Sequence, residues 1–192
     1  MERRARVHRT TRETDILVEV LLDGQGRAEV ELRPAFLAHM LEVLSHHSLV
    51  DLTVTARGDL VHHLVEDVAL ALGAAVNQAL GERTGIRRFG SALVPLDEAL
   101  ALASVDLARR PFSVADLKLM REMIEDMPRE DIAHFLRSLM TAMEACAHIV
   151  VLYGENDHHK IEAGVKAFAL ALRMAMSPDP QRSGVPSSKG VI

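Results

Sequence analysis

The chain has 192 residues, a length that suits one domain or two small halves sharing a core. Hydrophobic residues make up 48% of it and charged residues 26%, so there is enough apolar material for a sizeable interior. The formal net charge of −5 and the aromatic content of 3% argue against a nucleic-acid-binding protein. The single cysteine, Cys146, excludes an intrachain disulfide and a cluster of thiolate metal ligands.

The N-terminus predicts no targeting segment. Met1-Glu2-Arg3-Arg4 is basic, but the apolar core that a signal peptide needs does not follow it. No run of 18 apolar residues occurs, so we expect no transmembrane helix. Together with the lone cysteine, these features predict a cytoplasmic protein.

Alternating apolar residues predict strands in the first 60 residues. After a polar segment from His8 to Asp15, apolar residues alternate from position 16 to 22 and again from 28 to 32. The turn sequence Asp23-Gly24-Gln25-Gly26 separates the two runs, which predicts a β-hairpin. Residues 49–55 alternate in the same way and predict a third strand.

Helical spacing of apolar residues predicts a helix that begins at Pro34 and ends with His46 and His47. His39 lies on this helix, where a lone histidine is usually just a half-buried residue. After the third strand, Gly58-Asp59 turns into a second helix that ends at Gly81 to Gly85.

The second half of the chain repeats this plan. Strands are predicted at 100–106 and 112–119, then a helix from Pro128 to about residue 145 and a strand at 148–153. Asn156 or Asp157 caps a last helix. From Ser177 onward the chain is rich in Pro, Ser and Gly, which predicts a mobile loop.

These elements predict an α+β fold made of two duplicated halves. Residues 1–90 and 91–176 each read strand–strand–helix–strand–helix, and residues 177–192 form a flexible C-terminal loop over the active site. We expect mainly antiparallel sheets with helices packed on one face of each. The helices of the two halves should pack together, because each half has one apolar face to bury.

A short histidine–carboxylate unit occurs once in each half. The copies are His62-His63-Leu64-Val65-Glu66 and His158-His159-Lys160-Ile161-Glu162, 96 residues apart, which is half the length of the chain. Each copy opens a long segment with helical apolar spacing. This matched repetition predicts an ancient duplication in which each half carries the same metal-ligand unit.

Helix geometry explains the spacing within this unit. Residues three and four apart share a helix face, so Glu66 lies beneath His62 and His63. Adjacent side chains diverge by about 100°, so the two histidines are better suited to two ions than to one. The alternative is that the histidines merely cap or pack the helix start. A fainter repeat accompanies the unit, since residues 132–136, around His134, echo residues 37–41, around His39, at an offset of 95.

Several segments, taken together and in this order, resemble the imidazoleglycerol-phosphate dehydratase family of histidine biosynthesis. They are Arg12-Glu13-Thr14-Asp15-Ile16, Phe36-Leu37-Ala38-His39-Met40-Leu41, the first HHxxE unit, Gly85-Ile86-Arg87-Arg88-Phe89-Gly90, Arg110-Pro111, the second HHxxE unit with Lys166-Ala167-Phe168, and Gly184-Val185-Pro186-Ser187-Ser188-Lys189-Gly190. The resemblance implies a hydro-lyase that removes water from D-erythro-imidazoleglycerol phosphate to give imidazole-acetol phosphate. It also implies a homo-oligomer of 24 subunits with two Mn²⁺ per active site, held at subunit contacts.

The resemblance implies eight metal ligands, which would be four for each of two ions. They are His39, His62, His63, Glu66, His148, His158, His159 and Glu162. Imidazole and carboxylate ligands without sulfur suit Mn²⁺, and by ligand type they also fit Zn²⁺, Fe²⁺ or Co²⁺. Ions on both ring nitrogens of the substrate would hold the ring as an imidazolate, which favours loss of hydroxide.

Proton transfer and phosphate binding need further residues. Glu13 is the candidate proton carrier and substrate contact, with Glu66 and Glu162 as further catalytic carboxylates; an ordinary surface charge is the alternative for Glu13. The residues implied to bind the phosphate are Arg88, Arg110, Lys166, Ser187 and Lys189. Arginine offers a bidentate fork and lysine a point charge. For Lys166, an ion pair with Glu162 one helical turn away is the alternative.

The sequence also departs from the family pattern. The family has two aspartates directly before the first histidine pair, but here Asp59-Leu60-Val61 leads straight into His62. This predicts the loss of a helix N-cap and of a carboxylate that orients the imidazoles. A family aspartate and a family arginine are replaced by Ala38 and Val150. Two functions therefore stay open: the dehydratase, and a metal-binding oligomeric relative with lost or altered activity.

Overall fold

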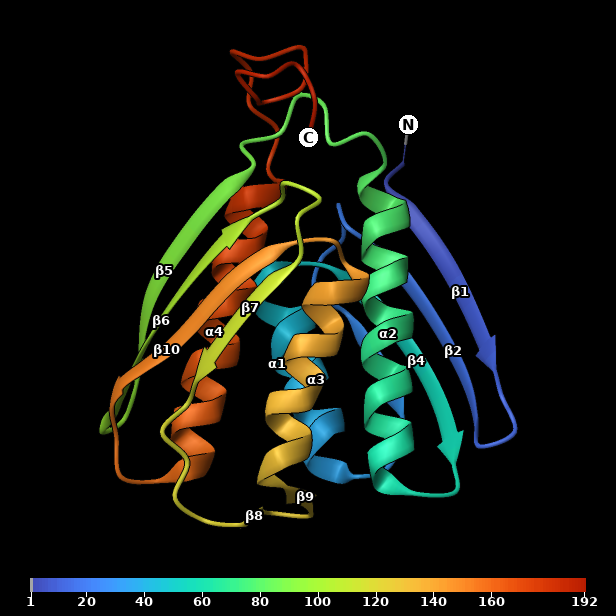
Figure 1. Cartoon of the computed structure of the whole chain (residues 1–192), viewed down its shortest axis with the longest axis vertical. Coiled ribbons are helices and arrows are strands. Elements are labelled where there is room, and N and C mark those ends of the chain that lie inside the picture. The colour runs from blue at the N-terminus through green and yellow to red at the C-terminus, as the bar shows by residue number, and fades with distance from the viewer. Residues whose placement is uncertain (1) are drawn as a thin grey trace.

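The computed structural model describes residues 2–192 as two four-stranded sheets that enclose four helices (Figure 1). The first sheet contains, in spatial order, β1 (Arg4–Thr10), β2 (Thr14–Leu21), β4 (Asp51–Gly58) and β3 (Ala28–Glu31). The second contains β5 (Phe89–Leu96), β6 (Ala99–Asp106), β10 (Cys146–Tyr153) and β7 (Phe112–Asp116). The helices are α1 (Ala35–Ser48), α2 (Val61–Leu80), α3 (Arg129–Ala142) and α4 (Asp157–Met176). A small ribbon of β8 (Met123–Ile124) and β9 (Met127–Pro128) precedes α3.

The two sheets have the same topology. In the first, β4 pairs antiparallel with β2 and parallel with β3. In the second, β10 pairs antiparallel with β6 and parallel with β7. Antiparallel pairs predominate, and the predicted α+β class with antiparallel-dominated sheets is confirmed.

The predicted hairpin between residues 16–22 and 28–32 is wrong. Both strands form, but β4 lies between them in the sheet, so β2 and β3 do not pair. The turn between them is instead attached to the start of β4, because the Asp51 carboxylate accepts hydrogen bonds from the backbone N–H groups of Gln25 and Arg27. The strand that separates β2 from β3 comes later in the chain, after α1.

Each half also contains a strand that the apolar pattern did not predict. Residues 4–10 form β1, which overlaps the predicted polar segment only at residues 8–10, and β5 lies in residues for which no strand was expected. Both are edge strands, paired only with β2 and β6, respectively. All of β1 is half-exposed or exposed, and Ala5 and Val7 are its only apolar residues, so its apolar signal is too short to predict a strand.

The helices fill the space between the sheets, as predicted for two apolar faces that must be covered. The inward positions of the central strands are buried: Ile16, Val18, Val20, Ala101, Ala103 and Val105. Helix α2 covers the first sheet and α4 the second, while α1 packs on α4 and α3 packs on α2. Although α2 and α4 each have 20 residues, neither these nor any other helix within residues 2–192 has the apolar stretch needed to cross a membrane.

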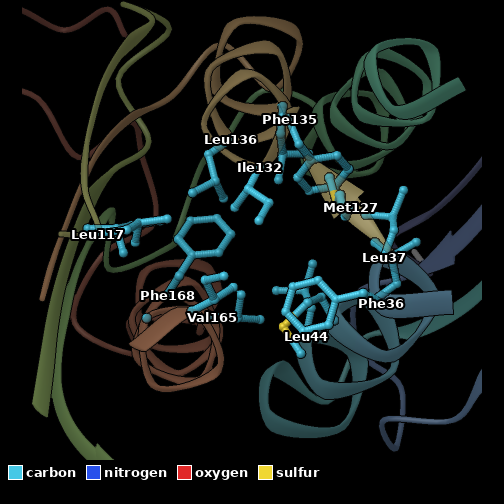
Figure 2. A pocket seen from close by; sticks show the side chains of 16 residues that line it. Phe36, Leu37, Leu44, Leu117, Met127, Ile132, Phe135, Leu136, Val165 and Phe168 are labelled. Atoms are coloured by element: carbon cyan, nitrogen blue, oxygen red, sulfur yellow. The ribbon is translucent and has the colours of Figure 1, made fainter. Parts of the chain in front are cut away.

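A small apolar cavity of about 40 Å³ lies in the core where α1, α3 and α4 meet. Figure 2 shows the rings of Phe36, Phe135 and Phe168 around it, with aliphatic side chains closing the remaining sides. Its lining offers almost no polar surface, so a water molecule there would find no hydrogen-bond partners. The cavity is therefore a packing gap of the core.

Candidate metal centre

The first histidine–carboxylate cluster joins α1 to the first turns of α4. Oε2 of Glu162 lies 3.3 Å from Nε2 of His39 and 3.2 Å from Nε2 of His158. Because His158 and Glu162 are four residues apart on α4, one helix face presents both. The three ligand atoms lie within 4.8 Å of one another, which is a spacing that a single cation can span.

The second cluster joins α2 to α3 and consists of His62, Glu66 and His134. The ligand atoms again lie within 4.8 Å of one another, with Nε2 of His134 3.5 Å from Oε2 of Glu66. The rings of His62 and His134 stack with centroids 5.1 Å apart. Nε2 of His134 is buried and has no hydrogen-bond partner among residues 2–192. A buried imidazole nitrogen without a hydrogen-bond partner, placed beside a carboxylate, fits a metal ligand.

The two clusters correspond to each other in the repeated sequence pattern, and each draws on both halves of the chain. His39 and His134 occupy equivalent positions at an offset of 95, and the two HHxxE units follow at 96. In one cluster α1 of the first half meets α4 of the second, and in the other α2 of the first half meets α3 of the second. All four helices begin at the same end of the molecule, the lower end in Figure 1.

The second histidine of each pair points away from its cluster. The ring centroids are 6.3 Å apart in His62–His63 and 6.1 Å apart in His158–His159, with interplanar angles of 64° and 86°. His63 Nδ1 lies 2.9 Å from Asp59, and His159 Nδ1 lies 2.7 Å from Glu98. This divergence is the arrangement expected if each unit gives one imidazole to each of two ions.

The carboxylates behind these two histidines perturb their pKa values. The hydrogen bond to Asp59 raises the pKa of His63, and the one to Glu98 raises the pKa of His159. The pKa of Glu98 is lowered to about 2, chiefly because its carboxylate accepts from the backbone N–H of Asn156 and also from His159. Glu98 thereby connects the β5–β6 turn to the N-terminus of α4.

Every histidine of the two HHxxE units has a carboxylate at Nδ1. Asp131 lies 2.7 Å from Nδ1 of His62, and Glu125 lies 3.2 Å from Nδ1 of His158. An ionised carboxylate only accepts hydrogen bonds, so Nδ1 carries the proton and Nε2 keeps the lone pair that can ligate a metal. The donor set therefore fits a divalent cation: imidazole Nε2 atoms and one carboxylate at each cluster.

The predicted loss of an orienting carboxylate before His62 is only half right. Helix α2 does begin without a side-chain cap, because its N-cap residue is Leu60, whereas Asn156 caps α4 by accepting from the backbone N–H of His158. Carboxylates nevertheless reach both histidines of the first pair, from Asp59 in the preceding loop and from Asp131 on α3.

The structure brings His134 into a cluster in place of His148. His148 lies on the outer face of β10, exposed, with its ring 6.0 Å from Phe112 and away from both clusters. His134 was not among the sequence-derived ligands, although its signal was present: its segment echoes that of His39. Read together with the 96-residue offset of the HHxxE units, this echo pairs His134 with His39.

The residues implied to bind phosphate lie mostly at the far end of α4. Arg88 lies beside the C-terminus of this helix, because its backbone N–H donates to the carbonyl of Ala175. Its guanidinium forms an ion pair with Asp106. Its guanidinium also donates to the carbonyl of Pro186, which brings the segment containing Ser187 beside it. His158 and Ala175 are separated by roughly 25 Å at 1.5 Å per residue. Within one chain, this cationic group and the first cluster are therefore too far apart to share one small substrate.

Lys166 and Glu13 lie nearer to the histidines. Nζ of Lys166 is 2.7 Å from Oε1 of Glu162, the ion pair considered as the alternative for this lysine. Burial raises the pKa of Glu162, but the hydrogen bonds from Lys166 and His39 outweigh it and the net pKa is lowered. Glu13, at the β1–β2 turn, is 54% exposed and has its Oε2 3.7 Å from Nδ1 of His63.

Comparisons with known proteins agree on one family. The sequence profile described as imidazoleglycerol-phosphate dehydratase matches residues 33–172. The imidazoleglycerol-phosphate dehydratase of Chlorobium luteolum is 49% identical over 193 residues, covering 99% of this chain and 96% of the relative. That of Streptomyces avermitilis is 47% identical over 197 residues, covering 100% of both.

Solved structures give the same result for the fold. The crystal structure of the Pyrococcus furiosus protein of this family has a TM-score of 0.85 at 36% identity, covering 97% of this chain and 100% of that one. The Staphylococcus aureus imidazoleglycerol-phosphate dehydratase has a TM-score of 0.84 at 29% identity, covering 92% and 99%. The chain therefore belongs to the imidazoleglycerol-phosphate dehydratase family, the hydro-lyases of histidine biosynthesis.

Proposed function

We propose that this chain converts D-erythro-imidazoleglycerol phosphate to imidazole-acetol phosphate and water with two divalent cations, preferably Mn²⁺, per active site. The observation that carries the proposal is the pair of duplicated clusters, each with two imidazoles and one carboxylate converging within 4.8 Å. Such a donor set without sulfur suits Mn²⁺ among the available divalent metals. The names of the similar proteins supply the substrate.

Six residues would hold the two ions in the chain itself. They are His39, His158 and Glu162 for one, and His62, Glu66 and His134 for the other. The remaining histidines of the pairs, His63 and His159, point outward and are suited to complete the clusters of neighbouring subunits. Divalent ions bound there supply Lewis acidity toward the imidazole ring and the departing hydroxyl.

Glu13 is the candidate to move the proton. Glu66 and Glu162 belong to the clusters, whereas Glu13 belongs to neither and lies beside His63, exposed enough to reach a substrate. Its carboxylate takes the proton from the carbon next to the one that loses hydroxide, and proton and hydroxide leave as water. The backbone holds this carboxylate near the first histidine pair, because the carbonyl of Glu13 accepts from the N–H of Asp59.

The phosphate is bound by cations of a neighbouring subunit in this proposal. The roughly 25 Å along α4 between His158 and the Arg88 group support an active site assembled from more than one chain. Arg110, Ser187 and Lys189 complete that group, and residues 177–192 close over the bound substrate. We propose an assembly of 24 subunits, as the family resemblance implies, and a cytoplasmic location, for which the lone cysteine is the support.

One preparation tests the proposal. Metal-free protein is loaded with Mn²⁺ and incubated with imidazoleglycerol phosphate while the enolisable ketone product is measured. Ketone formation that depends on metal is expected; metal binding without ketone under any divalent ion would favour the metal-binding relative. In the same preparation, His62→Ala and His159→Ala should lower the bound metal and the particle mass. Unchanged metal content and mass in both variants would contradict metal sites at subunit contacts.

A further inference from the structure

Asp131 is a buried carboxylate in direct contact with one of the cluster histidines. Its side chain is 4% exposed, and its Oδ1 lies 2.7 Å from Nδ1 of His62, a residue on another helix and 69 positions away in the chain. A carboxylate is costly to bury without a partner, and no other hydrogen bond to this side chain occurs among residues 2–192. The contact with His62 is therefore the hydrogen bond that supports this buried carboxylate.

A single turn of α3 serves the second cluster twice. Asp131 and His134 are three residues apart and share a face of the helix, on which α2 packs. His134 turns its Nε2 toward Glu66, while Asp131 holds the back of the His62 ring. Two ligands on different elements are thus fixed relative to each other by one rigid helix.

The first cluster has no buried carboxylate at the corresponding position. The position equivalent to Asp131, by the offset of 95 that relates His134 to His39, is Phe36, whose ring packs on His158 with centroids 5.1 Å apart. Nδ1 of His158 instead faces Glu125, which is 52% exposed, at 3.2 Å. The carboxylate of this cluster is also engaged by a cation, since Lys166 lies 2.7 Å from Glu162. The duplicated clusters are therefore electrostatically unequal.

We infer that Asp131 is a positioning residue that keeps the proton of His62 on Nδ1 and makes the His62–Glu66–His134 cluster the tighter of two unequal divalent-cation sites. This inference rests on the proposed metal-dependent function. A carboxylate behind a ligating imidazole fixes its tautomer and orientation and raises its basicity, and loss of such a partner typically costs ten- to a hundredfold in metal affinity. The buried position of Asp131 protects this interaction from screening by solvent.

The tautomer of His62 is tested first, in the metal-free protein. Long-range ¹⁵N–¹H spectra of histidine-labelled protein report which ring nitrogen carries the proton. The neutral His62 ring should be Nδ1-protonated in the wild type and in Asp131→Asn, whose amide oxygen still accepts, and should become a mixture in Asp131→Leu. A mixed tautomer in the wild type, or an unchanged spectrum in Asp131→Leu, would overturn the inference.

Metal titration by calorimetry tests the affinity. Wild-type protein should bind Mn²⁺ in two unequal steps, and Asp131→Asn should weaken the tighter step ten- to a hundredfold while the other stays unchanged. His134→Ala should remove that same step. Glu130→Gln is the matched control, because Glu130 is the exposed neighbour in the same helical turn and should leave both steps unaltered.

The outcomes distinguish the inference from the function on which it rests. If the wild type binds no divalent metal, both are overturned. If it binds two ions and Asp131→Asn titrates like the wild type, or loses both steps equally, only the role of Asp131 fails. Thermal unfolding of each metal-free variant, followed by circular dichroism, establishes that the comparison is made between folded proteins.

Discussion

His134 and Glu66 meet at 3.5 Å across the interface between α3 and α2, although they come from opposite halves of the chain. Their counterparts, His39 and Glu162, meet at 3.3 Å across the interface between α1 and α4. Each ligand set is therefore completed by a helix that the other half of the sequence provides. The interfaces between the two halves are also where the candidate chemistry lies.

His134→Ala should remove about half of the bound divalent metal, because the second cluster loses one of its two imidazoles. His148→Ala, on the outer face of β10, should leave the metal content unchanged. Elemental analysis of both purified variants decides between the two histidines. Loss of metal in His148→Ala with full occupancy in His134→Ala would restore the assignment drawn from the family resemblance.

Lys160→Met should destabilise the protein by about 3 kcal/mol, since it removes the buried cation beside a buried carboxylate and leaves only the exposed Arg121, 3.7 Å away. Lys160 and Asp157 are each 2% exposed and 2.9 Å apart, and Asp157 also accepts the N–H groups of Met120 and Arg121. Lys118→Met removes an exposed lysine from the loop that contains Met120 and Arg121, and it should change the free energy of unfolding far less. Equal denaturant midpoints for the two variants would contradict the buried-pair argument.

Asp51→Asn should lower stability at neutral pH by about 1 kcal/mol and lose most of that effect in strong acid. The hydrogen bond from Arg27 is the main reason that the pKa of Asp51 falls from 3.8 to about 2. A carboxyl group with a lowered folded-state pKa stabilises the fold above pH 3.8, and this contribution disappears as the pH falls through 2. Melting temperatures of both proteins from pH 7 to pH 2 should therefore converge, and a constant gap would argue against this role.

Two helical glycines should respond oppositely to alanine. A Cβ on Gly73 would lie 2.6 Å from the carbonyl oxygen of Leu139 and 2.7 Å from Cβ of Ala142, so Gly73→Ala should separate α2 from α3 and cost about 2–4 kcal/mol.

A Cβ on Gly164 would meet side-chain tips of Ile149 and Leu117 at 3.2 and 3.4 Å, beside the core cavity into which they can move. Gly164→Ala should stabilise by roughly 0.5–1 kcal/mol through helix propensity. Chemical denaturation measures both, and equal signs would contradict the contrast.

Deletion of residues 183–192 should raise the KM for the phosphate substrate at least tenfold and leave metal content and particle mass unchanged. The segment lies beside Arg88 through the carbonyl of Pro186 and is also held by Gly85, whose N–H donates to the carbonyl of Gly184. Deletion of Val191 and Ile192 alone serves as the control. Normal kinetics in the longer truncation would rule out a role of this segment in substrate binding.

Local spacing was sufficient to predict the helices and the faces of the HHxxE units, because the three- and four-residue intervals of a helix hold in any tertiary context. Strand order was not predictable from local spacing, since β4, which lies between β2 and β3 in the sheet, comes after α1 in the sequence. The hairpin prediction is wrong for this reason. The apolar pattern does not reveal the edge strands, because β1 has only two apolar residues and outward-facing positions of β5, such as Phe89 and Leu93, are themselves apolar.

In the candidate site, too, local spacing was predictable and long-range contacts were not. His158 and Glu162 share a helix turn and were predictable, whereas Asp131 reaches His62 from 69 residues away and left no local pattern. His134 is an intermediate case: its segment repeats that of His39, but a repeat of one histidine among apolar residues carries little weight without the packing of α3 on α2. The family resemblance predicts His148 instead, but the structure places this residue on the exposed face of β10.

Each ligand set combines a helix from the first half of the chain with a helix from the second, and this arrangement has an evolutionary consequence. A polypeptide of half this length, carrying one HHxxE unit and one helix of the α1 type, would build both ligand sets by pairing with a copy of itself about a two-fold axis. Fusion of two such copies would free the two sets to diverge, which would account for Asp131 and Phe36 at equivalent positions of the repeat. Cutting the chain in the connection between α2 and β5 should accordingly yield two fragments that reassemble when co-expressed.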